Sequence, residues 1–189
     1  MDAGWQNAYD EDESIIYLLD GELKIARCNP AWDRFALANG GERAVAARVT
    51  GTHVMDVVPP PLTEFYSIAY GNVRKFRKDW WHVFECSSAA IRRVFQMRIL
   101  PAREGLLVVN TLIRETPAEA GEHGPPRDYD AGDGMLTACS HCRRVRNVRM
   151  AGRWDWAPEV AWSGELLTVF DLCEFCRAYH SHRGSLDRV

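Results

Sequence analysis

Apolar and polar residues alternate along the first half of the chain in a pattern that predicts five β-strands. Residues 14–19 and 23–28 are rich in strand-forming side chains and flank Asp20-Gly21, a dipeptide typical of hairpin turns. Further on, Phe95, Met97 and Ile99 alternate with polar residues, so one face of that strand is expected to be buried and the other wet. The three later strands are expected at residues 81–86, 92–100 and 106–113.

A different spacing predicts helices between and after these strands. Asn29-Pro30 is a helix start, with Asn as the N-cap and Pro at the first helical position. Residues 62–78 have apolar side chains at steps of three and four, which indicates the longest amphipathic helix of the chain. A last helix is expected at residues 173–180.

Composition then divides the chain. Residues 115–134 hold three prolines, four glycines and six acids against one arginine, without periodicity, which is typical of a linker. We therefore expect three parts: a strand-rich domain at 14–113, an acidic Pro/Gly linker at 114–134, and a cysteine-bearing annex at 135–182.

The overall charge narrows the classes of partner. The chain has 189 residues, of which 47% are hydrophobic and 26% charged, and its net charge of -3 argues against nucleic acid as a partner of the whole molecule. No apolar run approaches the ~18 residues that span a bilayer, so a membrane partner is not expected. One local exception is a basic cluster, which either balances a negatively charged site or contacts nucleic acid: Arg143, Arg144, Arg146 and Arg149.

Four of the six cysteines form two Cys-x-x-Cys pairs, Cys139 with Cys142 and Cys173 with Cys176. This spacing lets one turn aim two thiolates at one point, and two such turns make the tetrahedral sulfur cage that zinc takes in closed structural sites. The sequence therefore predicts Zn²⁺ bound by these four residues. His180 and His182 could replace a thiolate as ligand, but four sulfurs fit the pattern better.

Other roles for the cysteine pairs stay open. A redox dithiol normally occurs as one pair at a strand-to-helix junction rather than as two distant pairs. Structural disulfides belong to secreted proteins, whereas the acidic stretch Asp10-Glu-Asp-Glu13 and the absence of an early apolar run give no sign of a secretory signal. We therefore expect a cytoplasmic chain with reduced thiols. Neither pair is followed by His, so covalent haem attachment is not supported.

The order of these elements resembles that of a PAS domain. The resemblance covers residues 14–113 and includes two runs typical of bacterial PAS sensors, Cys28-Asn-Pro-Ala-Trp-Asp-Arg-Phe35 and Gly51-Thr-His-Val-Met-Asp-Val-Val-Pro59. It implies an α+β fold, a five-stranded antiparallel sheet with helices on one face, and a pocket between sheet and helices. It also implies dimerisation through the PAS domain and signal transduction through a separate output partner, because no output domain is visible.

The annex is similar to a cysteine-rich tail found beside PAS or receiver modules in bacterial signalling proteins. The similar residues are Cys139-Ser-His-Cys-Arg-Arg-Val-Arg146, Arg153-Trp154 and Cys173-Glu-Phe-Cys176. Members of that group often carry Ser-His-Gly before the second pair, where this chain has Phe170-Asp171-Leu172. The resemblance therefore supports a small annex held together by zinc. If the histidine turn of that group has a role in function, this chain lacks it.

The identity of a PAS ligand is not fixed by the sequence. Neither Cys28 nor Cys86 lies in the Asn-Cys-Arg-Phe-Leu context of photoactive flavin sites, and the long helix holds no histidine for haem. His53 and His82 are the candidates for haem ligation, although a lone histidine in such a place is more often packed or at the surface. A small molecule could contact inward apolar residues that otherwise simply fill the core: Phe35, Phe65, Ala69, Phe95 and Met97.

These patterns favour a sensor or interaction module over an enzyme. A site with four cysteine ligands leaves no open position for catalysis, and no nucleophile comes with a readable base. The favoured hypothesis is a stand-alone PAS-type sensor with a structural zinc site that signals by protein contact. The alternatives are a zinc-thiolate redox sensor and a sensor that binds haem or another small molecule.

Overall fold

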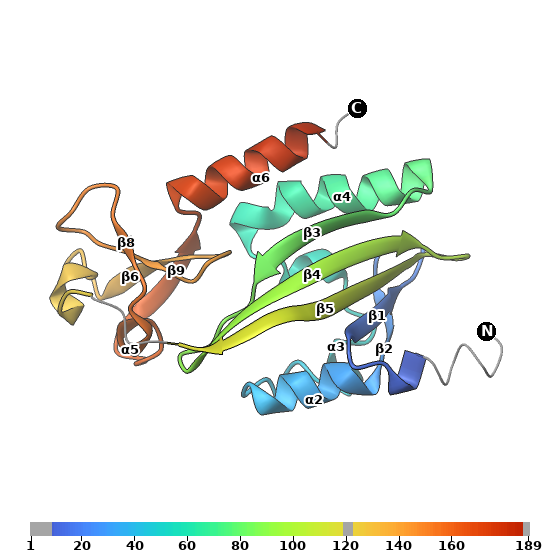
Figure 1. The fold of residues 1–189 in the computed structure, drawn as a ribbon, viewed down its shortest axis with the longest axis horizontal. Helices are drawn as coiled ribbons and strands as arrows, with labels where there is room; N and C mark the ends of the chain where they lie inside the picture. Colours follow the sequence, from blue (N-terminus) through green and yellow to red (C-terminus); the bar gives the residue numbers. More distant parts are fainter. Residues whose placement is uncertain (1–8, 119–122, 187–189) are drawn as a thin grey trace. The chain divides into compact units, whose positions relative to one another are not determined.

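The computed structural model describes residues 9–118 and 123–186, which fold into two compact units (Figure 1). Of the described residues, 9–58, 66–83 and 95–113 belong to the first unit, and 59–65, 84–94, 114–118 and 123–186 to the second. Two short segments of the predicted strand-rich domain thus cluster with the C-terminal part. The boundaries 14–113, 114–134 and 135–182 themselves stay a prediction. Among the described residues, no helix combines the length and apolar content that crossing a bilayer requires.

A five-stranded antiparallel sheet is the main element of the fold, in the strand order β2-β1-β5-β4-β3. β1 lies between β2 and β5 and pairs with both in antiparallel register. The α+β class and the five strands predicted from the apolar pattern are therefore confirmed. The strands are β1 (Ile15–Leu19), β2 (Ile25–Cys28), β3 (Trp80–Glu85), β4 (Ile91–Pro101) and β5 (Leu106–Pro117).

Helices pack on one face of this sheet, as the alternation in β4 predicts. Phe95, Met97 and Ile99 are buried, and the ring of Phe95 lies edge-on to Phe35 of α2 with centroids 5.6 Å apart. The predicted long helix is α4, which begins one residue later than the pattern suggested because η2 precedes it. The helical elements are α2 (Pro30–Ala38), α3 (Ala46–Val49), η1 (Val54–Val57), η2 (Pro60–Leu62) and α4 (Thr63–Phe76).

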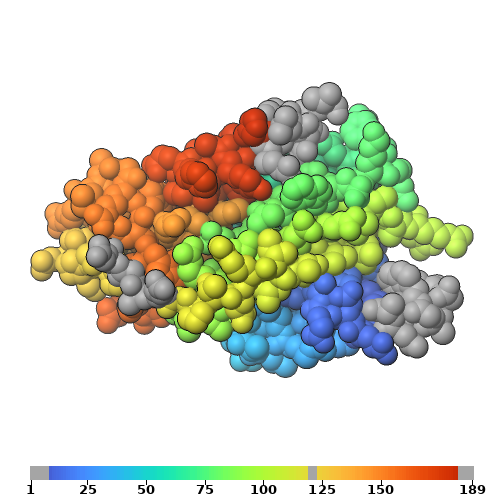
Figure 2. Space-filling model, in the orientation of Figure 1, coloured from blue at the N-terminus to red at the C-terminus, as the bar shows by residue number. Residues whose placement is uncertain are grey.

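The second unit contains a small sheet that the sequence did not indicate. Its order is β8-β7-β6-β9, and β6 and β9 run parallel. The space-filling view shows the orange residues of this region packed as a continuous body (Figure 2). Its small core consists of Tyr129, Leu136, Ala138, Val145, Ala157 and Val160. The elements are η3 (Pro126–Asp128), β6 (Met135–Cys139), β7 (Val145–Arg146), β8 (Trp154–Asp155), α5 (Pro158–Ala161), β9 (Leu167–Asp171) and α6 (Glu174–Leu186).

Part of the segment interpreted as a linker is packed structure. β5 continues to Pro117, and Tyr129 is fully buried in the core of the second unit. The sequence of residues 115–134 did not predict the burial of Tyr129, because a single aromatic side chain among prolines, glycines and acids creates no periodicity.

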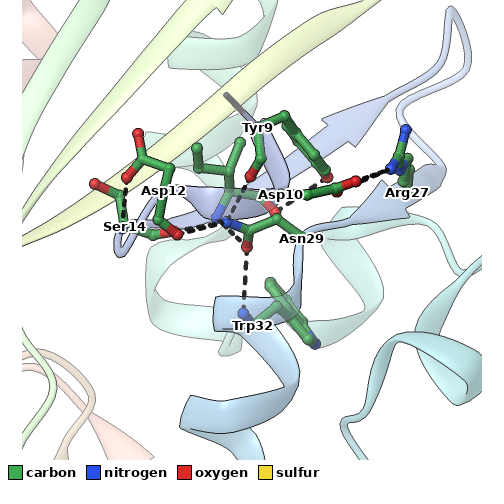
Figure 3. A network of polar contacts seen from close by, with 8 residues as sticks. Tyr9, Asp10, Asp12, Ser14, Arg27, Asn29 and Trp32 are labelled. Carbon is green, nitrogen blue, oxygen red and sulfur yellow. Dashed lines mark hydrogen bonds and ion pairs between the residues drawn. The ribbon is translucent and has the colours of Figure 1, made fainter. Parts of the chain in front are cut away.

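Asn29 ties the start of the first unit together (Figure 3). Its side-chain oxygen accepts hydrogen bonds from the backbone N–H groups of Ile16 (3.0 Å) and Trp32 (3.2 Å), so the predicted N-cap of α2 also fixes β1. Its amide nitrogen donates to the carbonyl oxygens of Tyr9, Asp12 and Ser14. Because Asn29 is buried, water cannot replace these bonds.

Asn29→Ala is expected to destabilise the first unit by about 3 kcal/mol, because it removes a cap and leaves several buried backbone groups unsatisfied. Hydrogen exchange of the β1 and α2 amides measures the loss. Asn39→Ala is the matched control at the other end of α2, where the side chain is exposed and donates a hydrogen bond to the Phe35 carbonyl oxygen. Equal exchange in the two variants would contradict this account of Asn29.

Candidate metal centre

The parallel pair β6 and β9 brings the two Cys-x-x-Cys turns together. Parallel neighbours end at the same edge of a sheet, and Cys139 at the end of β6 is in register with Asp171 at the end of β9. The backbone N–H of Ser140 then donates to the Asp171 carbonyl oxygen (2.7 Å), which fixes the two turns against each other. Cys142 follows in the turn before β7, and Cys173 immediately precedes α6.

The four predicted ligands form one buried cluster. All four sulfur atoms lie within 4.8 Å of one another, and the Cys142 and Cys173 Sγ atoms are 3.9 Å apart. Zinc–sulfur bonds of about 2.3 Å in a tetrahedron place sulfurs about 3.8 Å apart, which agrees with this spacing. The thiols are free rather than disulfide-bonded. The geometry and the donor set therefore fit a single thiophilic ion.

Backbone groups support the sulfur cluster. The N–H of Cys173 points at the Cys139 Sγ (3.4 Å), and the N–H of Cys176 at the Cys173 Sγ (3.5 Å). Cys173 thus takes the capping position of α6, so the positive end of that helix dipole faces the thiol cluster. In the first turn, Arg143 has a φ of 61°, a left-handed conformation that lets its N–H donate to the Cys139 carbonyl oxygen.

The thiols perturb one another strongly. Hydrogen bonds from the Cys142 and Cys176 thiols lower the pKa of Cys139. In turn, the hydrogen bond that Cys142 makes to Cys139 raises the pKa of Cys142 to about 12. The bond that Cys176 makes to Cys139 raises the pKa of Cys176. The Cys139 thiolate is thus stabilised by hydrogen bonds from neighbouring thiols, which hold their own protons more tightly in return.

The four clustered arginines divide between two roles. Burial lowers the pKa of Arg144, but the charge of Cys142 and a hydrogen bond to it outweigh this effect and raise that pKa above its ordinary value. Arg143 lies over the ring of Phe170, 5.4 Å from its centroid. Arg144 therefore fits the predicted charge-balancing role, whereas the exposed Arg146 and Arg149 line a hollow whose lining contains none of the four cysteines.

Two histidines pair beside the cysteines, a contact that the sequence did not predict. The His141 Nδ1 and His180 Nε2 atoms are 2.9 Å apart, and the His180 ring lies 4.5 Å from that of Phe65. Burial lowers the pKa of His180 to about 4 and also lowers that of His141, so both rings are neutral near pH 7. Among the described residues, the group able to share one ion consists of the four cysteines, without these histidines.

A buried carboxylate organises the rest of the second unit. Asp155 accepts hydrogen bonds from the Tyr129 hydroxyl (2.9 Å), the Asn147 amide (3.1 Å) and the Arg153 guanidinium (2.6 Å). Burial alone would raise the pKa of Asp155, but these three donors lower it. Asp155 thus connects Tyr129, Asn147 and Arg153 through hydrogen bonds. The sequence pattern did not predict this network.

The residues predicted to line a PAS pocket lie in two places. Phe35, Ala69, Phe95 and Met97 belong to the first unit, whereas Phe65 belongs to the second and contacts His180. His82 is buried, with its Nε2 3.1 Å from the Tyr66 hydroxyl, and the Nδ1 of His53 accepts a bond from the Met55 N–H. Binding of a small molecule or haem stays a prediction.

Cys28 and Cys86 take no part in the sulfur cluster. Both are partly buried, and burial raises the pKa of each thiol. Partial burial and a raised pKa are typical of cysteines that pack as small apolar residues.

Comparison with known proteins gives structural similarity without a matching family. No family model matches the chain, and no curated protein matches its sequence. Among solved structures, the PAS domain of a Colwellia psychrerythraea protein matches with 15% identity and a TM-score of 0.46, covering 58% of this chain and 94% of that one. The PAS domain of Bordetella pertussis BvgS matches with 16% identity and a TM-score of 0.41, covering 58% and 80%. The PAS domain of nitrogen regulation protein NR(II) from Vibrio parahaemolyticus matches with 14% identity and a TM-score of 0.41, covering 60% and 100%.

Asp155→Asn is expected to destabilise the second unit by about 2 kcal/mol, because the amide loses the charge of the acceptor and turns a donor toward other donors. The change is measured by hydrogen exchange of the β6, β7 and β8 amides. Asp130→Asn is the matched control, since Asp130 only accepts bonds from the Gly132 and Gly134 N–H groups through one oxygen, which asparagine also provides. Unchanged protection in Asp155→Asn would show that the network is dispensable.

Proposed function

We propose that this chain is a PAS-type sensory module whose annex binds one zinc ion at a closed structural site and which signals by contact with another protein. The observation that carries the zinc assignment is the buried cluster of four cysteine sulfurs within 4.8 Å of one another. The sensory assignment is supported by the predicted PAS-like order of strands and helices, which the five-stranded sheet matches. We place the protein in the cytoplasm, where thiols remain reduced, and expect a homodimer.

Zinc supplies charge neutralisation and a cross-link in this proposal, rather than catalysis. Cys139, Cys142, Cys173 and Cys176 would hold it, and four sulfurs leave no open position for a substrate. Binding couples to folding, because the unfolded chain has no preformed cage, and the coupled free energy is on the order of 10 kcal/mol at neutral pH. A core as small as that of the second unit needs such support.

The second unit also contains the turn between β3 and β4, which offers a route from the sensory sheet to the annex. Residues 84–94 cluster with the cysteine-bearing part. The Arg92 guanidinium lies 5.5 Å from the Trp156 ring centroid, and Arg93 forms an ion pair with Glu115 (2.7 Å). We propose that a change in β3 and β4 reaches the annex through this turn.

Purified protein is expected to contain one zinc ion per chain, measured by elemental analysis and native mass spectrometry. Cys142→Ser and Cys173→Ser should each lose the metal and unfold the annex, because three thiolates no longer close the cage. Cys86→Ser is the matched control in the same unit and should retain zinc. Reduced, metal-free protein with an ordered annex would refute the proposal.

A redox sensor is the second candidate, since oxidation of zinc-bound thiolates would release the ion and form disulfides. The burial of the cysteines speaks for the structural role instead: Cys139 is 0% exposed and Cys173, the most accessible of the four, 5%. Cysteines that sense oxidants are generally accessible to solvent.

Mild peroxide is therefore expected to leave zinc content and oligomeric state unchanged, because the sulfurs are inaccessible in the folded state. Thiol counting and zinc release measure the result on the same sample. Rapid release of zinc, with disulfides between the two Cys-x-x-Cys pairs, would favour the redox sensor over the structural site.

A further inference from the structure

A hollow of about 570 Å³ lies on the small sheet of the second unit, and the four clustered cysteines are not part of its lining. The lining includes Met135 and Thr137 of β6, Val169 of β9, and the two arginines Arg146 and Arg149. The face of β6 that carries Leu136 and Ala138 is buried, so the hollow occupies the opposite face.

Apolar side chains on this face continue beyond the hollow. Met135 is in register with Leu167, and Thr137 with Val169, so these four side chains line up on neighbouring strands. Leu167 is 74% exposed and Val169 46%. β9 is moreover an edge strand of the sheet and carries neither lysine nor proline, the residues that commonly protect such edges. An exposed apolar row at an edge is typical of a surface that binds another polypeptide.

The charge at the hollow indicates what kind of polypeptide fits. Within the described chain, Arg146 and Arg149 form no ion pair with a side chain, although both are exposed beside the hollow. The one carboxylate in the lining, Asp133, accepts a hydrogen bond from the Met135 N–H (3.0 Å). Two guanidinium groups beside apolar side chains complement a segment in which carboxylates flank apolar residues.

We propose that this hollow and the adjoining row of β9 bind an acidic, apolar-centred segment of a partner protein, with its carboxylates on Arg146 and Arg149 and its apolar side chains on Met135 and Val169. The inference rests on the proposed signalling by protein contact and assigns that contact a place and a chemistry.

Nucleic acid and a small molecule fit this surface less well. A phosphate backbone would leave the apolar row beyond the hollow without an apolar partner, whereas an acidic segment with apolar residues at its centre would cover it. A small molecule would leave the exposed Leu167 uncovered, because that residue lies outside the hollow lining.

The test measures fluorescence polarisation of a short labelled peptide with a leucine pair between runs of glutamate, using the full-length zinc-loaded protein. The same peptide with lysine in place of glutamate is the charge control. The double variant Arg146→Ala/Arg149→Ala is expected to weaken binding of the acidic peptide about tenfold or more. Val169→Asp should weaken it similarly, because a carboxylate would repel the peptide from the apolar part of the lining. Arg127→Ala removes an exposed arginine of the same unit outside the hollow and should change nothing.

Each result decides between this inference and its rivals. Equal binding of both peptides, or an unchanged affinity in the double arginine variant, would overturn it. Tighter binding of a single-stranded DNA oligonucleotide through the same arginines would assign the surface to nucleic acid instead. Self-association abolished by Val169→Asp, without peptide binding, would assign it to a second copy of the chain. Zinc content of each sample separates the two proposals: zinc-loaded protein that ignores the acidic peptide overturns only this inference, whereas metal-free protein overturns the proposed function.

Discussion

Four cysteine sulfurs gathered at one point set the main constraint on the second unit, because their thiolate forms would repel one another. Two unit charges about 4 Å apart repel by about 4 kcal/mol at the effective dielectric constant of a protein near its surface. Six such pairs among four thiolates within 4.8 Å of one another sum to an energy on the order of 20 kcal/mol. That exceeds what a small core can offset, so the cluster is either largely protonated or organised by a cation. The proposed zinc site corresponds to the second of these states.

The fold around the cluster follows from this requirement. Parallel β6 and β9 end at the same edge, so two turns distant in sequence present their sulfurs to one point. The N-terminus of α6 adds positive potential, and Arg144 adds a full charge near Cys142. One apolar cluster of this unit, among the described residues, is small: six buried residues with Ala161 and Leu166 packed against them. The hydrogen bonds of Asp155 therefore contribute stability to this unit that apolar packing contributes in larger domains.

The sequence predicted those features whose cause is local. Asn29-Pro30 predicts a helix start because the asparagine cap and the fixed φ of proline both act within one turn. The helix α2 begins at Pro30. The Cys-x-x-Cys spacing likewise predicts that one turn supplies two ligands. In β4, the alternation of apolar and polar residues predicts which face of the strand is buried. Three features have no local pattern that would predict them. They are the burial of Tyr129, the pairing of His141 with His180, and the parallel register of β6 with β9. Each depends on residues far apart in sequence, and strands as short as β7 and β8 are too brief for a recognisable period.

The same parallel pairing of β6 and β9 connects the proposed metal site with the proposed binding face. The sulfurs are removed from solvent, so a metal held there stabilises the fold and does not meet a partner directly. A metal bound in the proposed cage would fix the ends of β6 and β9, and with them the positions of Met135 and Val169 further along the same two strands. Loss of such a metal would release the strand ends first and would distort the exposed face with them. The sulfur cluster and the exposed face belong to one pair of strands, so the proposed metal site would give the proposed binding face a defined shape.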